Sequence, residues 1–198
     1  MSKTGTTITY DYDRNGLRVR KTVNGVTTNY TLNGTQITHL TKDTDWMHFY
    51  YGVGEKPVLV NFNGTMYTYV YSLQGDVVAL LDAGGNVVVE YKYDAWSNIV
   101  ARTGSLVSTL GYLNPFRYRG YVYDEETGLY YLRSRYYKAA WGRFVCADSF
   151  ETISIGSGKL SLYAYCINNP IIKNDTYGFR SQNAFVALYN YNGLFINK

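Results

Sequence analysis

The chain has 198 residues, which suits one domain with a sizeable core or part of a longer repeat array. Its 23 tyrosines and 19 glycines, with only 3 prolines, point to an all-β fold whose turns depend on Gly, Asn and Asp. The net charge of +4 is scattered, and Arg alternates with Tyr at strand spacing, which indicates a solvated strand face rather than a nucleic-acid interface.

A degenerate motif recurs along the chain. Its pattern is Tyr-x-Tyr-Asp, followed by a Gly and an alternation of apolar and polar residues. Its copies begin at Tyr10, Tyr30, Tyr69, Tyr91 and Tyr121. Two Tyr side chains at i and i+2 point to one face of a strand, the Asp ends the strand by bonding the backbone, and the Gly supplies a positive φ. This spacing predicts a succession of hairpins, each too small to bury a face alone.

The segments between these turns predict short strands. We expect strands over residues 17–23, 46–52, 76–82 and 86–94. Hairpin turns are expected at 24–25, 33–34, 63–64 and 82–86. Residues 102–114 carry small and polar side chains, so we expect them to connect the hairpins to the segment that follows.

Residues 115–179, the core block, are dense in Tyr, Arg and Gly. We expect one strand over 128–137, with Arg and Tyr alternating by face, and a turn over 138–142. The apolar positions of 159–167 fit one short helix, ended by Asn168-Asn169-Pro170.

The Cys and His residues give little support to a metal site. Cys146 and Cys166 show no metal-ligand spacing, so we expect buried thiols, with a single disulfide left open. His39 and His48 lie far from both Cys in the sequence. We therefore expect no metal and no cofactor.

The repeat resembles the YD repeat of Rhs proteins, and the core block resembles the Rhs repeat-associated core domain. That domain is also found in insecticidal toxin-complex C components and relates to the YD shell of teneurins. The segments FRYRGYVYDEETGLYYLRSRYY, GRFVCAD and LYAYCINNP follow the family's pattern in order. The resemblance implies an all-β fold in which YD hairpins form a spiralling sheet, part of a hollow shell, closed by a core-domain cap. It divides the chain into repeats (1–114), core (115–179) and a short variable tail (180–198).

The resemblance also implies a site. In the family, the cap is similar to an aspartyl protease and cuts the chain just after a D-P-x-G-L sequence. Arg143 and Asp148 match the Arg and first Asp of the family's G-R-F-x-x-x-D-P segment. Asp175 begins the stretch that matches the cleavage sequence, so the implied scissile bond is Phe179–Arg180.

This chain departs from the family pattern at three positions. Ser149 and Thr176 stand where the family has Pro, and Phe179 replaces Leu. Because Pro fixes φ and removes an N–H, both Asp loops are expected to be looser here, with added donors near the carboxylates.

Two interpretations of Asp148 and Asp175 stay open. Hydrolysis of a peptide bond needs an activated water and a proton for the leaving amine, which two neighbouring carboxylates supply when they share one proton. A nearby Arg143 would keep one of them ionised and anchored. Alternatively, both Asp residues are turn residues and Arg143 is their structural partner, because Asp is favoured at turns.

The favoured function is structural: the encapsulating end of an Rhs-type bacterial polymorphic toxin shell that holds or presents a C-terminal polypeptide. The alternative is a self-cleaving aspartyl protease that cuts after Phe179. A third hypothesis is glycan or protein binding by aromatic faces such as those of Trp46 and Trp96. The 19 residues from Arg180 onward are too few for an enzyme core, so a remnant or a strand tucked into the core block is expected there.

The expected partners are the chain's own C-terminal segment or toxin cargo, further YD repeats, and a cognate immunity or delivery protein; nucleic acid is not among them. No apolar run approaches the roughly 18 residues of a membrane span. The first residues lack the features of a signal peptide, although the intact protein is expected to be secreted or displayed at a cell surface.

Overall fold

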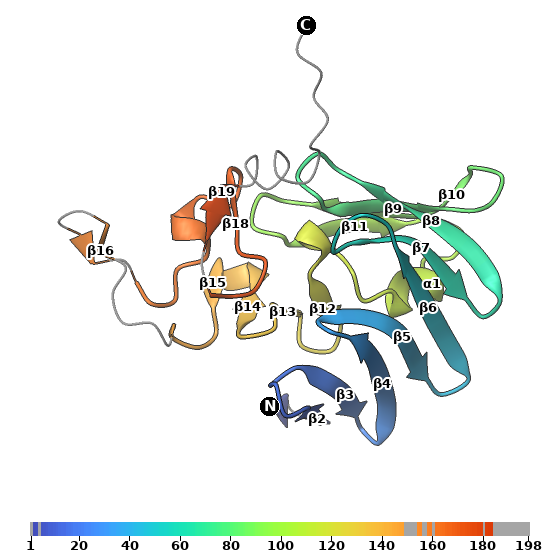
Figure 1. Ribbon diagram of the computed structural model, residues 1–198, viewed down its shortest axis with the longest axis horizontal. Coiled ribbons are helices and arrows are strands. Elements are labelled where there is room, and N and C mark those ends of the chain that lie inside the picture. Colours follow the sequence, from blue (N-terminus) through green and yellow to red (C-terminus); the bar gives the residue numbers. More distant parts are fainter. Residues whose placement is uncertain are drawn as a thin grey trace, which may run out of the picture.

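The strands between residues 2 and 103 form one antiparallel sheet in which each strand pairs with the next along the chain (Figure 1). The computed structural model describes residues 2–3, 5–148, 154–155, 158–159, 161–179 and 181–183. The strands of this sheet are β1 (Ser2–Lys3), β2 (Thr6–Tyr12), β3 (Arg18–Val23), β4 (Val26–Asn33), β5 (Gln36–Lys42), β6 (Asp45–Tyr51), β7 (Pro57–Phe62), β8 (Thr65–Tyr71), β9 (Val77–Leu81), β10 (Val87–Tyr93) and β11 (Ile99–Thr103). The strands expected from the sequence over 17–23, 46–52, 76–82 and 86–94 are confirmed as β3, β6, β9 and β10.

Asp side chains end the strands in the way that the repeat predicts. Oδ1 of Asp13 accepts hydrogen bonds from the backbone N–H groups of Asn15 (2.9 Å) and Leu17 (2.8 Å). Asp94 accepts the same pair of bonds from the residues two and four positions further on. Each carboxylate therefore occupies the backbone donors of a turn, which stops the strand and starts the next one.

One tyrosine of several repeats ties neighbouring strands together. Its hydroxyl group donates a hydrogen bond from the end of β6, β8 or β10 back to a carbonyl oxygen at the start of β5, β7 or β9. The bonds are Tyr51 to Ile37 (2.7 Å), Tyr71 to Pro57 (2.7 Å) and Tyr93 to Val77 (2.8 Å). Burial raises the pKa of all three hydroxyl groups, so they stay protonated donors. The repeat thus buries an aromatic ring and satisfies its polar end in one step.

One face of the sheet carries a continuous core. Its buried members are Tyr30, Ile37, Leu40, Met47, Phe49, Val60, Tyr67, Tyr69, Val77, Leu80, Val88, Val89 and Tyr91, joined by Leu110 and Phe116 from beyond the sheet. These side chains recur mostly at every second position, as a half-buried strand requires.

A second, four-stranded antiparallel sheet follows in the core block. It consists of β12 (Val122–Asp124), β13 (Leu129–Tyr131), β14 (Tyr136–Lys138) and β15 (Arg143–Phe144). In Figure 1 the first sheet curves from β2 at the bottom, past β6 on the right, to β9 and β10 at the top, and β12 to β14 lie between its two ends. The remaining elements are α1 (Leu110–Leu113), β16 (Ser154–Ile155), β17 (Gly158–Lys159), β18 (Lys173–Asn174), β19 (Gln182–Asn183) and the 3₁₀ turns Tyr118–Gly120, Ala139–Trp141 and Cys166–Asn168.

The predicted all-β fold with one short helix is confirmed, but the helix is not at 159–167. There, β17 ends at Lys159, Ala164 bridges to Arg143, and only the 3₁₀ turn Cys166–Asn168 follows. The apolar residues of this stretch do not share a helical face, because Leu162 and Tyr163 are exposed while Tyr165 is buried. Among the described residues the α-helix is α1, in the segment that was expected to be a plain connection.

The single strand expected over 128–137 is also wrong. The chain turns sharply between β13 and β14, where Arg133 has a φ of 65° and Leu132 N–H donates to the carbonyl oxygen of Arg135. The alternation of Arg and Tyr is real, but it belongs to a hairpin rather than to one extended strand.

The two cysteines are free, so the disulfide left open by the sequence is not formed in this structure. The Cys166 thiol is buried as expected, whereas Cys146 is exposed. Within the described ranges, no helix is long and apolar enough to cross a lipid bilayer.

Buried charge joins the second sheet to the first strands of the meander. The Asp124 carboxylate lies 2.6 Å from Nη1 of Arg18 and 3.2 Å from Nζ of Lys21. Both Asp124 and Arg18 side chains are only 1% exposed. Burial by itself raises the pKa of Asp124, but the charges of Arg18 and Lys21 outweigh it and hold that pKa below its ordinary value. The end of β12 is thereby fixed against β3.

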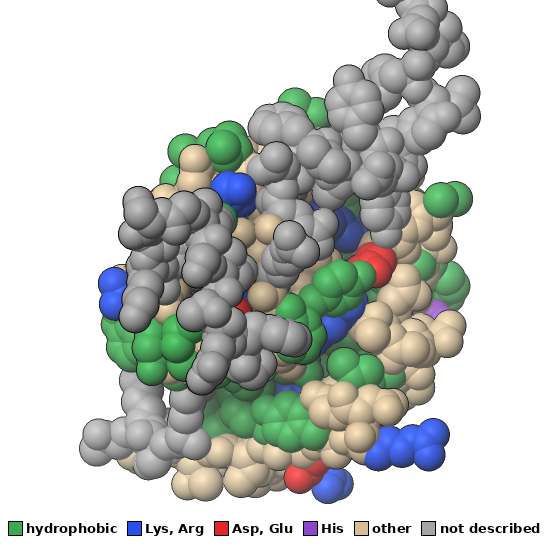
Figure 2. Space-filling view, turned by 60° about the vertical axis from the view of Figure 1, so that its left-hand side comes forward, with side chains coloured by type: hydrophobic (Ala, Val, Ile, Leu, Met, Phe, Trp, Pro, Cys, Tyr) green, Lys and Arg blue, Asp and Glu red, His purple; other side chains and the backbone are tan. Residues whose placement is uncertain are grey.

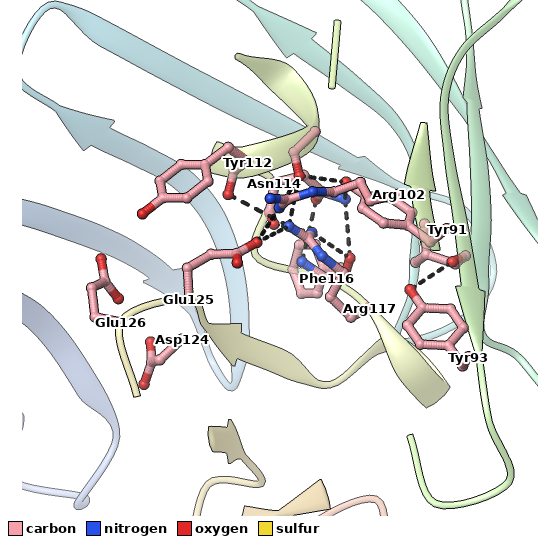
Figure 3. A network of polar contacts seen from close by, with 12 residues as sticks. Tyr91, Tyr93, Arg102, Tyr112, Asn114, Phe116, Arg117, Asp124, Glu125 and Glu126 are labelled. Carbon is pink, nitrogen blue, oxygen red and sulfur yellow. Dashed lines mark hydrogen bonds and ion pairs between the residues drawn. The ribbon is translucent and has the colours of Figure 1, made fainter. Parts of the chain in front are cut away.

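A second polar network joins the core block to the later strands (Figure 3). Arg117 is fully buried, stacks over the ring of Tyr91 at 4.3 Å, and donates to the carbonyl oxygen of Gly111 at 2.7 Å. Its Nη2 also lies 3.1 Å from the Glu125 carboxylate, which pairs with Arg102 of β11 as well. The core block therefore contacts both ends of the curved sheet through buried charges.

We predict that Asp124→Asn lowers the free energy of unfolding by about 3–5 kcal/mol, because it leaves the buried Arg18 without its carboxylate and Lys21 with Glu126 alone. Asp11→Asn is the matched control, since the Asp11–Arg20 pair is about half exposed and is expected to contribute under about 1 kcal/mol. Urea unfolding measures both values.

The pH dependence has a defined sign. Because the folded pKa of Asp124 is lowered, its contribution is complete above the unfolded value of about 3.9 and is lost as the pH falls through the folded pKa. The stability difference between wild type and Asp124→Asn should therefore shrink below about pH 4. A stability difference that stays constant down to pH 2 contradicts a contribution from the charge of Asp124.

Candidate functional site

The two aspartates singled out from the sequence meet on one arginine, Arg135. Its Nη1 lies 3.1 Å from Oδ2 of Asp148, and its Nη2 lies 3.3 Å from Oδ2 of Asp175. Asp175 is buried, at 2% exposure, and Asp148 is half-buried. The structure therefore brings together residues that lie 27 positions apart in the chain around a single guanidinium group.

Arg135 is held rigidly. Its guanidinium group stacks on the ring of Phe144, 3.6 Å from the ring centroid. Nη1 also donates to the carbonyl oxygen of Leu162 at 3.3 Å, and Nε donates to the carbonyl oxygen of Gly178. Arg135 thus links the hairpin of β13 and β14 to both aspartate loops and to the residue just before Phe179.

Arg143, the third residue of the predicted site, lies elsewhere in the arrangement. It is exposed on β15, where it pairs with Lys138 and bridges to Ala164 through the backbone. Among the ion pairs of the described residues, the cation that reaches Asp148 and Asp175 is Arg135 and not Arg143. The sequence contains one indication of this: a buried Arg needs a carboxylate partner, and Arg135 stands two residues before the buried Tyr137, just ahead of β14.

The stretch from Asp175 to Phe179 packs against the hairpin. The backbone N–H of Asp175 donates to the Tyr121 hydroxyl at 3.0 Å. The Ser134 hydroxyl donates to the carbonyl oxygen of Tyr177 at 2.7 Å. Gly178 has a φ of 74°, and a Cβ there would lie 2.6 Å from Oγ of Ser134. Only glycine fits this combination of backbone shape and close approach.

The predicted cleavage bond is partly outside the described residues. Phe179 is 48% exposed, whereas Arg180 and Ser149 lie beyond the described ranges. Beyond the predicted bond, β19 pairs with β18 in antiparallel register, Lys173 opposite Asn183 and Asn174 opposite Gln182. The segment after Phe179 therefore returns to the core block as a short strand.

The chemistry of this arrangement is centred on a cation. Arg135 pairs with both carboxylates and holds them close together. A general acid or base role would require one of them to exchange a proton with substrate or water. The described contacts thus provide an anchored pair of carboxylates next to a bent, partly exposed chain segment.

No metal site is formed in the described ranges, where no group of three or more His, Cys, Asp or Glu side chains is placed to hold an ion. His39 and His48 lie opposite each other on β5 and β6, with ring centroids 5.6 Å apart. Burial and the neighbouring His48 lower the pKa of His39. Trp46 and Trp96, considered for glycan binding, are half-buried; the Trp46 ring stacks on His39, and Gly142 packs closely against the Trp96 ring.

A curved meander of Tyr-Asp hairpins, joined at both ends to a second sheet by buried charges, defines a YD-repeat shell protein. The chain belongs to the Rhs/YD-repeat family: the Teneurin YD-shell family model matches residues 1–171. This match confirms the resemblance that the repeats and the core block indicated.

Curated relatives support the same family. The tRNA nuclease WapA of Bacillus subtilis (strain 168) is 40% identical over 174 residues, which are 86% of this chain and 7% of the relative. The toxin protein Tse5 of Pseudomonas aeruginosa is 41% identical over 64 residues, 32% of this chain and 5% of the relative. The chain thus spans a small part of the curated relatives it matches.

Solved structures show the same fold. The crystal structure of TcdB2-TccC3 superposes with a TM-score of 0.66 at 22% sequence identity, covering 90% of this chain and 10% of that one. The Tc holotoxin pore of Photorhabdus luminescens gives a TM-score of 0.65 at 21% identity, covering 93% of this chain and 10% of that one.

We predict that Gly178→Ala detaches the Asp175–Phe179 segment from the hairpin. Gly34→Ala is the matched control, because Gly34 also has a positive φ (57°) but a Cβ there meets nothing within 4 Å. Both variants should lose roughly 1–2 kcal/mol from the backbone conformation. Only Gly178→Ala should speed amide hydrogen exchange at Ser134, whose N–H donates to the carbonyl oxygen of Tyr177 at 3.3 Å as well as to that of Leu132 at 2.8 Å. Equal exchange rates at Ser134 in the two variants contradict the packing of residues 175–179 against the hairpin.

Proposed function

We propose that this chain is the closing end of an Rhs-type toxin shell, where it holds or presents a C-terminal polypeptide. In this proposal residues 1–114 contribute shell wall, residues 115–179 form the cap, and residues 180–198 begin the enclosed or presented segment. The observation that carries it is the pair of contacts from Asp124 to Arg18 of β3 and from Glu125 to Arg102 of β11, which attach the core block to both ends of the curved sheet.

The attachment fits a cap for a physical reason. An antiparallel meander has two free edges, and nothing within it sets how strongly it curls. The core block, which carries the second sheet, contacts β3 through Asp124. It contacts Arg102 of β11 through Glu125, and so it sets the distance between β3 and β11. It also covers the inner, aromatic face, which would otherwise be exposed to water.

The partners follow from this role. Further YD repeats would extend the wall from β1 and β2, since a strand edge is a template for pairing. The enclosed partner would be the chain's own C-terminal segment or a toxin, with a cognate immunity or delivery protein acting on the intact assembly. Secretion or display at the cell surface is proposed for that assembly and agrees with the toxin names of its relatives.

The test places YD repeats of the Bacillus subtilis relative before residue 1 and an epitope peptide after residue 198. We expect negative-stain images of a hollow particle closed at one end, and slower digestion of the epitope by an added protease than in the chain without added repeats. Asp124→Asn should restore rapid digestion, whereas Asp11→Asn should not. An epitope digested at the same rate with and without the repeats overturns the proposal.

Self-cleavage after Phe179 is the second candidate function. It is favoured by one observation: Asp148 and Asp175 converge on Arg135, which also bonds the carbonyl oxygen of Gly178 beside the predicted bond. In this proposal Arg135 takes the anchoring role that was predicted for Arg143. One carboxylate would activate water and the other would protonate the leaving amine.

Intact-mass measurement of the purified chain under denaturing conditions tests this activity. Denaturation matters because β18–β19 pairing would retain a released segment. We expect loss of the mass of residues 180–198, abolished by Asp148→Asn and by Asp175→Asn. Asp43→Asn is the control, since Asp43 is exposed in a turn with a φ of 52° that Asn adopts readily. A full-length mass after several days rules the activity out.

A further inference from the structure

A cavity of about 90 Å³ lies between the curved sheet and the core block. Its wall includes four cationic side chains, Arg18, Lys56, Arg119 and Arg133, and one carboxylate, Glu55. Aromatic and aliphatic side chains make up much of the remaining wall. This volume holds several water molecules or one small ligand. The cavity is distinct from the Asp148–Asp175 pair, which is absent from its wall.

Three of the arginines have a hydrogen-bond donor without a partner. The atoms are Nη2 of Arg18, Nε of Arg119 and Nη1 of Arg133, each buried and without a hydrogen-bond acceptor in the part of the chain that the structure describes. The Arg18 and Arg119 side chains are each about 1% exposed. A buried donor that bonds nothing costs free energy, so such groups point to an acceptor that the protein itself does not supply.

The nearby carboxylates do not fill this need. Asp124 is already shared between Arg18 and Lys21. The Asp76 carboxylate is 3.8 Å from Nε of Arg119, which is too long for a hydrogen bond. Glu55 is likewise 3.7 Å from Nη2 of Arg133.

The charged ends of Arg119 and Lys56 bond groups outside the cavity wall. Nη1 and Nη2 of Arg119 donate to the carbonyl oxygens of Gln74 at 2.9 Å and of Pro170 at 2.6 Å. Lys56 Nζ donates to the carbonyl oxygen of Gly75 at 3.0 Å, and its aliphatic stem would meet a Cβ on Gly120 of the wall at 3.3–3.4 Å. Lys56 takes part in no ion pair among the described contacts. Burial lowers its pKa to about 8, with the charge of Arg119 acting in the same direction and that of Asp76 against it.

The aromatic rings around these arginines stabilise the cations but accept only weak hydrogen bonds. Arg18 lies 4.6 Å from the ring centroid of Tyr131, and Arg133 lies 4.6 Å from that of Tyr177. Stacking of this kind leaves N–H groups at the edge of the guanidinium plane available to a stronger acceptor. The rings therefore build the site without occupying it.

We propose that this cavity binds a small oxyanion, a carboxylate or a phosphate, through Arg18 and Arg133. A carboxylate would come from an acidic side chain of a polypeptide, and a phosphate from free solution. Figure 2 turns the side of the molecule that carries β14 and β15 forward, and shows Lys and Arg side chains among hydrophobic ones on that face. The inference does not depend on the shell role, because the probes below are free anions.

The test is a titration of the full chain with sodium phosphate and, separately, sodium acetate, followed by thermal unfolding at constant ionic strength set with sodium chloride. We expect a saturating rise in Tm with at least one of the two anions. Tighter acetate binding assigns the site to carboxylates, and tighter phosphate binding assigns it to free phosphate.

The matched variants separate site binding from general screening. Arg133→Met should weaken the apparent Kd by about tenfold or more, since a hydrogen bond to a charged group is lost. Lys92→Met is the control, because Lys92 is exposed outside the cavity. Equal effects of both anions and of chloride, or an equal loss in the Lys92→Met control, overturn the proposal.

Discussion

The Asp124 carboxylate is the interaction on which the rest of the structure depends. It is removed from water at the end of β12, where a lone charge would be unstable. Arg18 and Lys21 reach it from β3, about a hundred residues earlier in the chain. The first strands of the meander must therefore fold over the second sheet for this charge to be compensated. Glu125 imposes the same condition at the other end of the meander, where it pairs with Arg102 of β11.

Between these two attachments, tyrosine side chains stabilise the sheet through buried rings and hydroxyl hydrogen bonds. Each buried ring extends the inner core, and hydroxyl groups such as those of Tyr71 and Tyr93 bond back to the preceding odd-numbered strand. This arrangement repeats without requiring an identical sequence, since it needs only a ring, a carbonyl oxygen and an Asp or Gly at the turn. It explains how a degenerate repeat maintains a regular sheet.

Arg135 organises the candidate site in the same manner, with one buried cation between two carboxylates. A structural role and a proteolytic role both begin from this arrangement. The proteolytic role alone requires a carboxylate to separate from Arg135 and accept or donate a proton. The oxyanion site proposed in the nearby cavity has the reverse composition, with cations in excess and a carboxylate in short supply. The balance of cations and carboxylates between the two sheets therefore determines both the Arg135 site and the proposed oxyanion site.

The sequence by itself determined the all-β class, the hairpins, the turn chemistry of Asp13 and Asp94, and the family. These properties are local, because alternation, Asp turns and Gly turns act over a few residues. The sequence also named Asp148 and Asp175. Only the tertiary structure decided that Arg135, and not Arg143, joins them, that 128–137 is a hairpin, and that the helix is α1. These features depend on which buried charges and aromatic rings come into contact across the two sheets. The spacing of residues along the chain does not specify those contacts.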